Sequence, residues 1–319
     1  MTIDRPGVEL LAELTLDAAE GPDVVAIGGG HGLARTLEAV VAYAGNTTAI
    51  VTVADDGGSS GRLSPALDIP PPGDIRRALL ALSADDSVWK GLVAHRFSEG
   101  DIAGHSLGNL ILAALTDQLG DFELGVEALG VMIGARGAVI PTAAVPLVLA
   151  AQVDGREVRG QVAIAQGRGR IERLWVEPSD APASVSALAA LAAADQIVLA
   201  PGSLYTSLLA SLVVGEMAEA INSARSTLVQ VGNLTTQDGE TLGLGGADHI
   251  DELSRIVGLR TPDRVVVHDG PLQVPPGVET LIFDDRPTVI RADVADSKDG
   301  HPQHNPARLA AVLRRLVDL

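Results

Sequence analysis

Four glycines and one histidine fill the segment Gly28–Gly32, directly after the apolar run Val24–Ile27. Apolar residues then recur at helical spacing, so this stretch predicts a strand, a tight turn and a helix. Glycines have no Cβ and let a phosphate approach the backbone, while the start of the following helix adds N–H donors and a favourable dipole. The segment therefore predicts an anion site that His31 can reach. A glycine-rich turn without a ligand is the alternative.

The glycine spacing does not fit the common nucleotide fingerprints. Counted from Gly28, the third glycine of a dinucleotide motif falls on Leu33, and counted from Gly30 it falls on Arg35. The chain has only two lysines, neither of them in a phosphate-binding loop of the Walker type. A dinucleotide-dependent oxidoreductase is therefore the weakest of three functional hypotheses.

A second polar segment, Asp55–Arg62, follows the apolar run Ala49–Ala54. Asp55 lies near the position where an acid of Rossmann-type proteins bonds a ribose diol. Alternatively, the adjacent carboxylates of Asp55 and Asp56 could hold Mg²⁺, which prefers oxygen ligands. A solvated turn with a helix cap is the third interpretation.

A third segment, Pro201–Ser207, follows a later apolar run. Gly202 frees the backbone, and the hydroxyls of Ser203 and Thr206 stand at the start of a helix, which predicts a second anion cradle. Ser203 could instead act only as a helix cap. Asn233 follows another strand and is expected at the same edge of the sheet.

Arginines between these segments could neutralise a diphosphate. Arg62 and Arg76 are the favoured counter-charges, because Arg77 is one helical step from Arg76 and faces another way. Asp74 is placed to cap a helix over 75–82. His105 and Asn109 share a face if helical, where they contact a ligand or cap the helix.

Composition excludes several classes of function. The chain has 319 residues, 46% of them apolar and only 2% aromatic, so a sizeable core must be built from Ala, Val, Leu and Ile. A net charge of −18 argues against nucleic acid as a partner. The absence of cysteine excludes thiol chemistry, and no nucleophile elbow supports serine hydrolysis.

No segment has the pattern of a signal peptide or a membrane span, because acidic residues interrupt the first twenty positions and two prolines break the apolar run 138–151. We therefore expect a soluble, cytoplasmic protein without membrane insertion.

Strands alternating with helices predict a single Rossmann-like α/β domain over residues 1–319, with a doubly wound, mostly parallel sheet. Residues 147–176 differ and predict a small β insertion: a hairpin of 147–153 and 157–164 around Asp154-Gly155, then a strand over 171–176. The predicted strands are 24–27, 49–54, 197–200, 227–231 and 264–268. The predicted helices are 75–82, 107–119, 122–132, 185–194, one from Tyr205, 248–257 and one in the tail after Pro302.

Together these segments resemble the signature segments of the YvcK-like gluconeogenesis factors, in the superfamily of CofD, the 2-phospho-L-lactate transferase. The resemblance spans roughly residues 23–310 and includes the segments 25–33, 51–63, 69–76, 103–109 and 201–207. It departs at His31, where the family usually has Thr, and at Gln303–Asn305, where a basic-His-Asp motif is expected; we carry no ligand binding over to the latter.

The resemblance implies a Rossmann-like protein that binds UDP-sugars such as UDP-N-acetylglucosamine or UDP-glucose. It also implies a cytoplasmic role in gluconeogenic growth, cell shape and cell-wall synthesis, through a protein partner that the sequence does not identify. Rossmann-like proteins of this size often form homodimers. The expected ligand-binding residues are Gly28, Gly29, Gly30, His31, Gly32, Asp55, Asp56, Gly57, Gly58, Ser59, Ser60, Arg62, Asp74, Arg76, His105, Asn109, Gly202, Ser203, Tyr205, Thr206 and Asn233.

Two hypotheses lead. In the first, the chain is a non-catalytic nucleotide-sugar binder: the two glycine bends hold the diphosphate, Asp55 or Asp56 meets the ribose, and Arg62 or Arg76 neutralises charge. In the second, it is a CofD-like transferase of a phosphorylated three-carbon acid to a deazaflavin, with Mg²⁺ on Asp55 and Asp56. The scarcity of aromatic side chains for a deazaflavin pocket favours the first.

Overall fold

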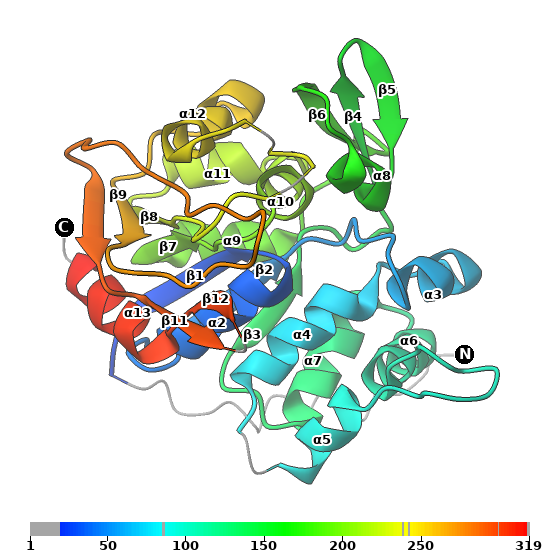
Figure 1. Ribbon diagram of the computed structural model, residues 1–319. Helices are drawn as coiled ribbons and strands as arrows, with labels where there is room; N and C mark the ends of the chain where they lie inside the picture. The colour runs from blue at the N-terminus through cyan, green and yellow to red at the C-terminus, as the bar shows by residue number, and fades with distance from the viewer. Residues whose placement is uncertain (1–19, 85–86, 238, 242, 299, 318–319) are drawn as a thin grey trace.

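The computed structural model describes residues 20–84, 87–237, 239–241, 243–298 and 300–317. The first nineteen residues lie outside these ranges. They form most of the stretch for which the sequence predicts no signal peptide. Within the described residues, seven parallel strands form one sheet in the order β10-β9-β8-β7-β1-β2-β3 (Figure 1). The strands are β1 (Asp23–Gly28), β2 (Asn46–Val51), β3 (Ala138–Pro141), β7 (Gln196–Leu199), β8 (Thr227–Val231), β9 (Arg264–His268) and β10 (Val289–Ala292).

The direction of winding reverses next to β1. The chain runs from β1 outward to β2 and β3, then returns to β7 on the other side of β1 and continues to β8, β9 and β10. Gly28 is in register with Val51 of β2, and Ile27 with Leu199 of β7, so the carboxyl ends of these strands lie along one rim. A doubly wound sheet of this order opens a crevice where the winding reverses. The predicted Rossmann-like fold is confirmed.

Helices cover both faces of the sheet. α2 (Gly30–Val40) and α13 (Pro306–Leu313) pack together on one face, whereas α9 (Val185–Ala193) and α11 (Met217–Ser223) pack together on the other (Figure 1). The central strands are almost entirely buried, as parallel strands covered on both faces must be. Their buried side chains are mainly Ala, Val, Leu and Ile, as the composition requires.

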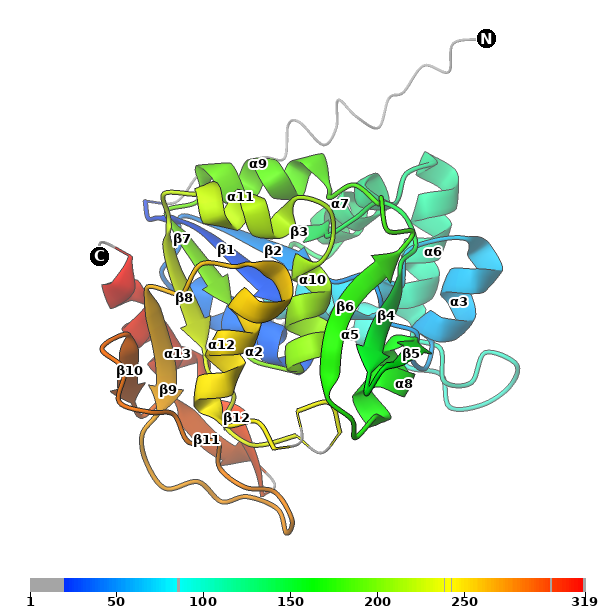
Figure 2. The ribbon, with the colours of Figure 1, turned by 90° about the horizontal axis from the view of Figure 1, so that it is seen from above.

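A small antiparallel sheet stands beside the main one (Figure 2). It contains β4 (Val148–Val153), β5 (Arg156–Arg159) and β6 (Ile171–Glu177), in the order β5-β4-β6. Asp154 and Gly155 form the hairpin turn with φ of 47° and 75°, a left-handed pair that suits this dipeptide. The predicted insertion is therefore present.

The second hairpin strand was predicted to run to residue 164, and this is wrong after Arg159. Gly160 has φ of 94°, and α8 (Gln161–Gln166) follows it. The carboxylate of Asp56 accepts a hydrogen bond from the backbone N–H of Val162 at 2.9 Å and so supports the first turn of α8. This support comes from a residue 106 positions away, which a local pattern cannot reveal.

Most other elements differ from the predictions by only one or two residues at an end, and three differ more. α4 (Pro72–Leu82) begins three residues before Ile75, because Pro72 suits the first helical position, so Asp74 lies inside the first turn rather than at the cap. β2 starts at Asn46 and leaves the ladder after Val51. The helix predicted from Tyr205 begins as a π-helical turn, Leu204–Leu209, and continues as α10 (Ala210–Leu212).

The remaining elements complete the chain. They are α3 (Ser60–Leu67), α5 (Val88–Ala94), α6 (Leu107–Leu119), α7 (Phe122–Met132), α12 (Gly246–Val257), β11 (Ala295–Lys298), β12 (His301–His304) and a 3₁₀ turn, Arg314–Leu316. The short strands β3, β10, β11 and β12 were not predicted. Among the described helices, none is by itself long and apolar enough to cross a membrane, although Leu204–Leu212 and Met217–Ser223, bent by 72°, pass together on length and composition.

Gly32→Ala tests the contact at the reversal point. A Cβ on Gly32 would lie 1.8 Å from the carbonyl oxygen of Pro201, so the two bends must separate. We expect the free energy of unfolding to fall by about 1–3 kcal/mol in urea titrations. Gly91→Ala in α5, where a Cβ meets open space, is the control and should stabilise by up to about 1 kcal/mol. Equal stability of the two variants would contradict the close contact.

Candidate functional site

Two glycine bends touch where the winding reverses. The bend after β1 places Gly32 against the carbonyl of Pro201, in the bend after β7, and a Cβ on Gly28 would contact Ala200 at 3.3 Å. Asn233, just after β8, clamps the second bend: its Oδ1 accepts from the N–H of Gly202 at 2.8 Å and its Nδ2 donates to the Gly202 carbonyl at 2.7 Å. The structure thus brings the first and third predicted segments together with Asn233 at one rim.

Asp74 joins α4 to the first bend. Its Oδ2 accepts from the backbone N–H of Gly30 at 2.9 Å, and its Oδ1 pairs with Arg77. A protein carboxylate therefore already uses one N–H donor of the predicted anion site. His31 in the same bend is exposed; burial, followed by the nearby charge of Arg77, lowers its pKa, which favours the neutral ring.

The two carboxylates of the second segment face apart. Asp55 is partly buried, its Oδ1 accepts from the N–H of Gly57 at 2.9 Å, and burial raises its pKa. Asp56 instead points to the start of α8, so the pair does not meet on one ion. Across the ranges that the structure describes, no group of three or more His, Asp or Glu side chains could hold a metal. Asp55 and Asp56, the pair that the transferase hypothesis assigns to Mg²⁺, are therefore not arranged to share one ion.

Four side chains from three segments form one buried hydrogen-bond chain. The Nε of Arg76 donates to Oδ1 of Asn109 at 2.9 Å, so the Asn109 amide is left to donate to Oγ of Ser59 at 3.1 Å. The Ser59 hydroxyl can then donate to Nδ1 of His105, 3.0 Å away. Burial, then Arg62 and Arg96, lower the pKa of His105, which agrees with a neutral ring that accepts at Nδ1. Sequence reasoning placed these residues at the site but not in one network.

Arg76 is a buried cation without an anionic partner. It is 7% exposed, and in the described part of the chain no carboxylate lies within 4.0 Å of it. Burial, and then repulsion from Arg77 and Arg96, lower its pKa to about 10, and the more distant charge of Asp74 opposes this shift. Arg96 and Arg62 are exposed and donate to the carbonyls of Gly104 and Ala103 rather than to acids. In a chain of net charge −18, this cluster of guanidinium groups points to an anion that comes from outside.

The third segment contributes less than predicted through its side chains. Tyr205 is buried, and its hydroxyl donates to Glu252 on α12 at 2.5 Å, away from the first bend. Thr206 is also buried, and its backbone N–H donates to Glu240 at 3.1 Å. Ser203 caps no N–H with its side chain and accepts from Gln237.

The other predicted residues fill supporting positions along the rim. Ser60 accepts from the N–H of Gly73 at 3.1 Å, and Gly58 takes a positive φ of 51° just before α3. Sequence reasoning missed Arg96 and Glu240 and set Arg77 aside. Their only sequence signal is position: Arg96 precedes the Ala103–Asn109 motif by a few residues, and Glu240 lies in the polar stretch after β8.

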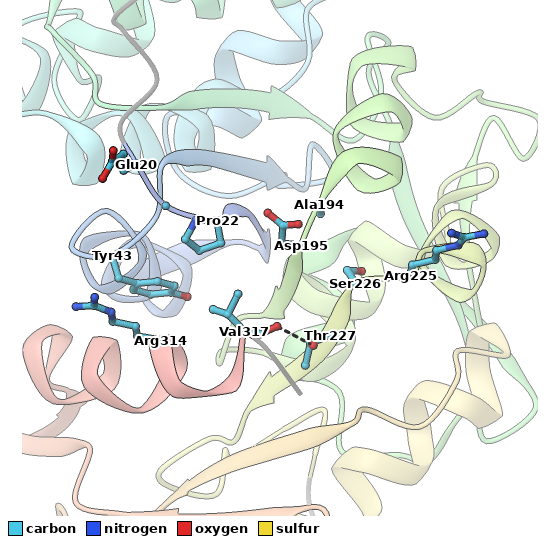
Figure 3. Close-up of a pocket in the computed structure, with 11 residues that line it drawn as sticks. Glu20, Pro22, Tyr43, Ala194, Asp195, Arg225, Ser226, Thr227, Arg314 and Val317 are labelled. Atoms are coloured by element: carbon cyan, nitrogen blue, oxygen red, sulfur yellow. Dashed lines mark hydrogen bonds between the residues drawn. The ribbon is translucent and has the colours of Figure 1, made fainter.

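A separate cavity of about 640 Å³ opens at the opposite, amino-terminal edge of the sheet (Figure 3). Tyr43, Asp195 and Thr227 are among its lining residues, near the starts of β1, β7 and β8. None of the predicted site residues lines it. Because ligands of doubly wound sheets bind at the carboxyl ends of the strands, the rim remains the candidate site.

Comparison with known proteins gives a consistent family assignment. Residues 24–296 match the CofD family, described as 2-phospho-L-lactate transferase CofD. A putative gluconeogenesis factor of Nostoc is 40% identical, with 97% of this chain and 72% of that protein covered. The gluconeogenesis factor of Bacillus subtilis is 43% identical, with 77% and 78% covered. The crystal structure of a UPF0052 family member from Bacillus halodurans superposes with a TM-score of 0.86 at 36% identity, covering 91% of this chain and 98% of that one.

Replacing Arg76 should stabilise the protein without ligand. Arg76→Met removes a buried charge that faces two other guanidinium groups and keeps most of the side-chain volume. The lost hydrogen bond to Asn109 offsets part of the gain, so we expect the free energy of unfolding to rise by about 1–2 kcal/mol. Urea unfolding measures it. Arg286→Met, at a half-buried arginine paired with the exposed Asp251, is the control and should be neutral or slightly destabilising. Destabilisation by Arg76→Met would show that the charge is compensated.

Asp56→Ala should loosen α8 and leave the rim intact. The variant removes the acceptor for the Val162 N–H, a cap-like bond whose loss costs about 0.5–1 kcal/mol. Hydrogen exchange should accelerate over residues 161–166. The control is Asp101→Ala, in an exposed turn. Unchanged exchange in α8 would contradict the role assigned to Asp56.

Proposed function

This chain belongs to the CofD family, and we propose that it is a regulatory protein that binds a nucleotide-sugar and acts in growth on gluconeogenic carbon sources. The regulatory part rests on its relatives, which are named gluconeogenesis factors. The proposal that it binds a nucleotide-sugar rests on the arrangement of residues at the rim of the sheet. The resemblance extends the proposal to cell shape and cell-wall synthesis, to the cytoplasm as its place of action, and to a protein partner or a second copy of the chain.

One observation carries the ligand proposal: Arg76 is buried without a carboxylate beside Arg77 and Arg96. An unpaired buried charge is costly, and a fold retains it where a ligand supplies the opposite charge. The diphosphate of a nucleotide-sugar has the required charge and suits guanidinium donors. In the first bend at the same rim, a Cβ on Gly30 would meet open space, so a phosphate can approach the backbone at this position.

The position of Asp55 supports a contact with the nucleoside part of the proposed ligand. It follows β2, the strand next to β1, as the ribose-binding acid of Rossmann-type proteins does. Asp56 is engaged with α8, so Asp55 is the carboxylate that we assign to the ribose. The neutral side chains of Ser59, His105 and Asn109 offer both donors and acceptors for sugar hydroxyls near the arginines.

Calorimetry against UDP-N-acetylglucosamine, UDP-glucose, NAD and GTP, each with and without Mg²⁺, tests the proposal. We expect UDP-sugar binding that needs no metal. Arg76→Met should weaken it at least about tenfold, the cost of losing one buried charge-assisted hydrogen bond. Arg286→Met, at the exposed pair with Asp251, should bind like the wild type.

The panel also separates the alternatives. Binding of GTP only with Mg²⁺ would favour a CofD-like transferase, and binding of NAD alone would favour an oxidoreductase. Equal UDP-sugar affinity of Arg76→Met and the wild type would overturn the assignment of the arginine cluster to the diphosphate.

A further inference from the structure

The second glycine bend already holds an anion that belongs to the protein. Glu240 lies in the segment after β8 and is only 6% exposed. Its Oε2 accepts from the backbone N–H of Thr206 at 3.1 Å. The backbone N–H of Tyr205 and the hydroxyls of Ser203 and Thr206 lie close enough to favour its charged form, which lowers its pKa. These four residues define what we call the Glu240 cradle.

The Glu240 cradle has the composition of a phosphate site. Two successive N–H groups stand at the start of the continuous helical stretch Leu204–Leu212, and two hydroxyls stand beside them. Gly202 stands just before this stretch, has φ of 145° and donates its N–H to Asn233. This bond fixes the backbone of the second bend next to the first glycine bend. Such an array of donors suits an oxyanion with several acceptor atoms. A carboxylate has only two oxygens and therefore satisfies only part of the array.

Glu240 fits this array imperfectly. Its Oε1 is buried and, among the residues that the structure describes, has no hydrogen-bond partner within standard geometry. Among the described residues, no cation contributes to the shift of its pKa, which comes from burial and from the donors of the cradle. A buried carboxylate that keeps one oxygen unsatisfied and has no counter-charge is held at a cost in free energy.

We propose that the Glu240 cradle is an anion subsite of the nucleotide site, filled by the Glu240 carboxylate in the free protein and taken over by a phosphate group of the bound ligand. The proposal rests on the proposed function, because it places one phosphate of the nucleotide-sugar at this bend. The other phosphate then lies toward the arginine cluster, across the contact between the two bends. Ligand binding thus requires the Glu240 side chain to leave the cradle, and protonation of Glu240 makes this easier because a neutral acid is held less strongly by the N–H donors.

The protonation of Glu240 couples to this exchange. Burial raises its pKa to about 7, and the cradle donors oppose the shift. Of the elements packed against the bend, α8 has no ionisable side chain, and α12 has Asp248, His249, Asp251, Glu252 and Arg255. Glu252 is bonded to Tyr205 and Arg255, and His249 bonds the Gly245 carbonyl with its pKa lowered by burial. None of these groups contributes to the shift at Glu240.

The test measures binding of UDP-N-acetylglucosamine at pH 6 and pH 8 to the full chain. Its diphosphate does not titrate between these values, whereas Glu240 does. An ionised Glu240 competes for the cradle, so wild-type affinity should fall by up to about tenfold as the pH rises, since one ionisation with a pKa near 7 is involved. Glu240→Gln should bind more tightly than the wild type at pH 8, with little dependence on pH. Glu219→Gln, an exposed acid on α11, is the charge-matched control and should behave like the wild type.

Two probes keep this inference separate from the proposed function. If no UDP-sugar binds to the wild type or to any variant at either pH, the proposed function fails. Sulfate binding then tests the cradle alone. Glu240→Gln should bind sulfate at least severalfold more tightly at pH 8 than the wild type. Thermal unfolding is the second probe. Because the folded pKa is raised, the wild type should lose stability relative to Glu240→Gln as the pH rises from 5 to 8.

Equal pH dependence of ligand affinity in the wild type and Glu240→Gln would overturn the proposal, as would equal sulfate affinity. If the variant does not fold, the wild type alone decides: affinity that is flat or rises between pH 6 and pH 8 contradicts competition by Glu240.

Discussion

The close contact between the bends after β1 and β7 is the constraint on which the rest of the site depends. Gly32 lies against the Pro201 carbonyl, where even one methyl group has no room. The contact follows from the sheet order, because β1 and β7 are neighbours although 168 residues separate Gly28 from Gln196. It aligns two sets of backbone donors along one rim, and β8 adds Asn233 as the clamp of the second set.

The rim carries a cluster of arginines, although the whole chain is acidic. The protein has 41 acidic and 23 basic residues, yet Arg62, Arg76 and Arg96 hydrogen-bond only to uncharged oxygens in the described structure. Acidic partners are abundant elsewhere, as at Arg286 and Arg308. These three arginines therefore make no ion pair with a carboxylate of the described residues, unlike Arg77, which is paired with Asp74, and an uncompensated charge of this kind raises the energy of the free protein.

Two internal carboxylates nonetheless occupy backbone donors of the glycine bends. Asp74 accepts from Gly30 in the first bend, and Glu240 accepts from Thr206 in the second. Asp74 is paired with Arg77 and so belongs to a stable arrangement, whereas Glu240 lacks a cation and leaves one oxygen unsatisfied. The two bends are thus not equivalent. The acid of the first bend is ion-paired, whereas the acid of the second bend is not paired in the described structure and is the easier one to displace.

The amino-acid sequence by itself determined the parallel core strands, the hairpin insertion around Asp154 and the family, because buried runs, turn dipeptides and long motifs are local patterns. It also predicted Asp55, Gly202 and Asn233 at one rim, since residues after neighbouring parallel strands share an edge. Only the tertiary structure decided that Asp56 supports α8, that Arg76 reaches Ser59 and His105 through Asn109, and that Glu240 fills the second bend. These contacts join residues 33 to 106 positions apart, and their partners depend on how the elements pack rather than on any spacing along the chain.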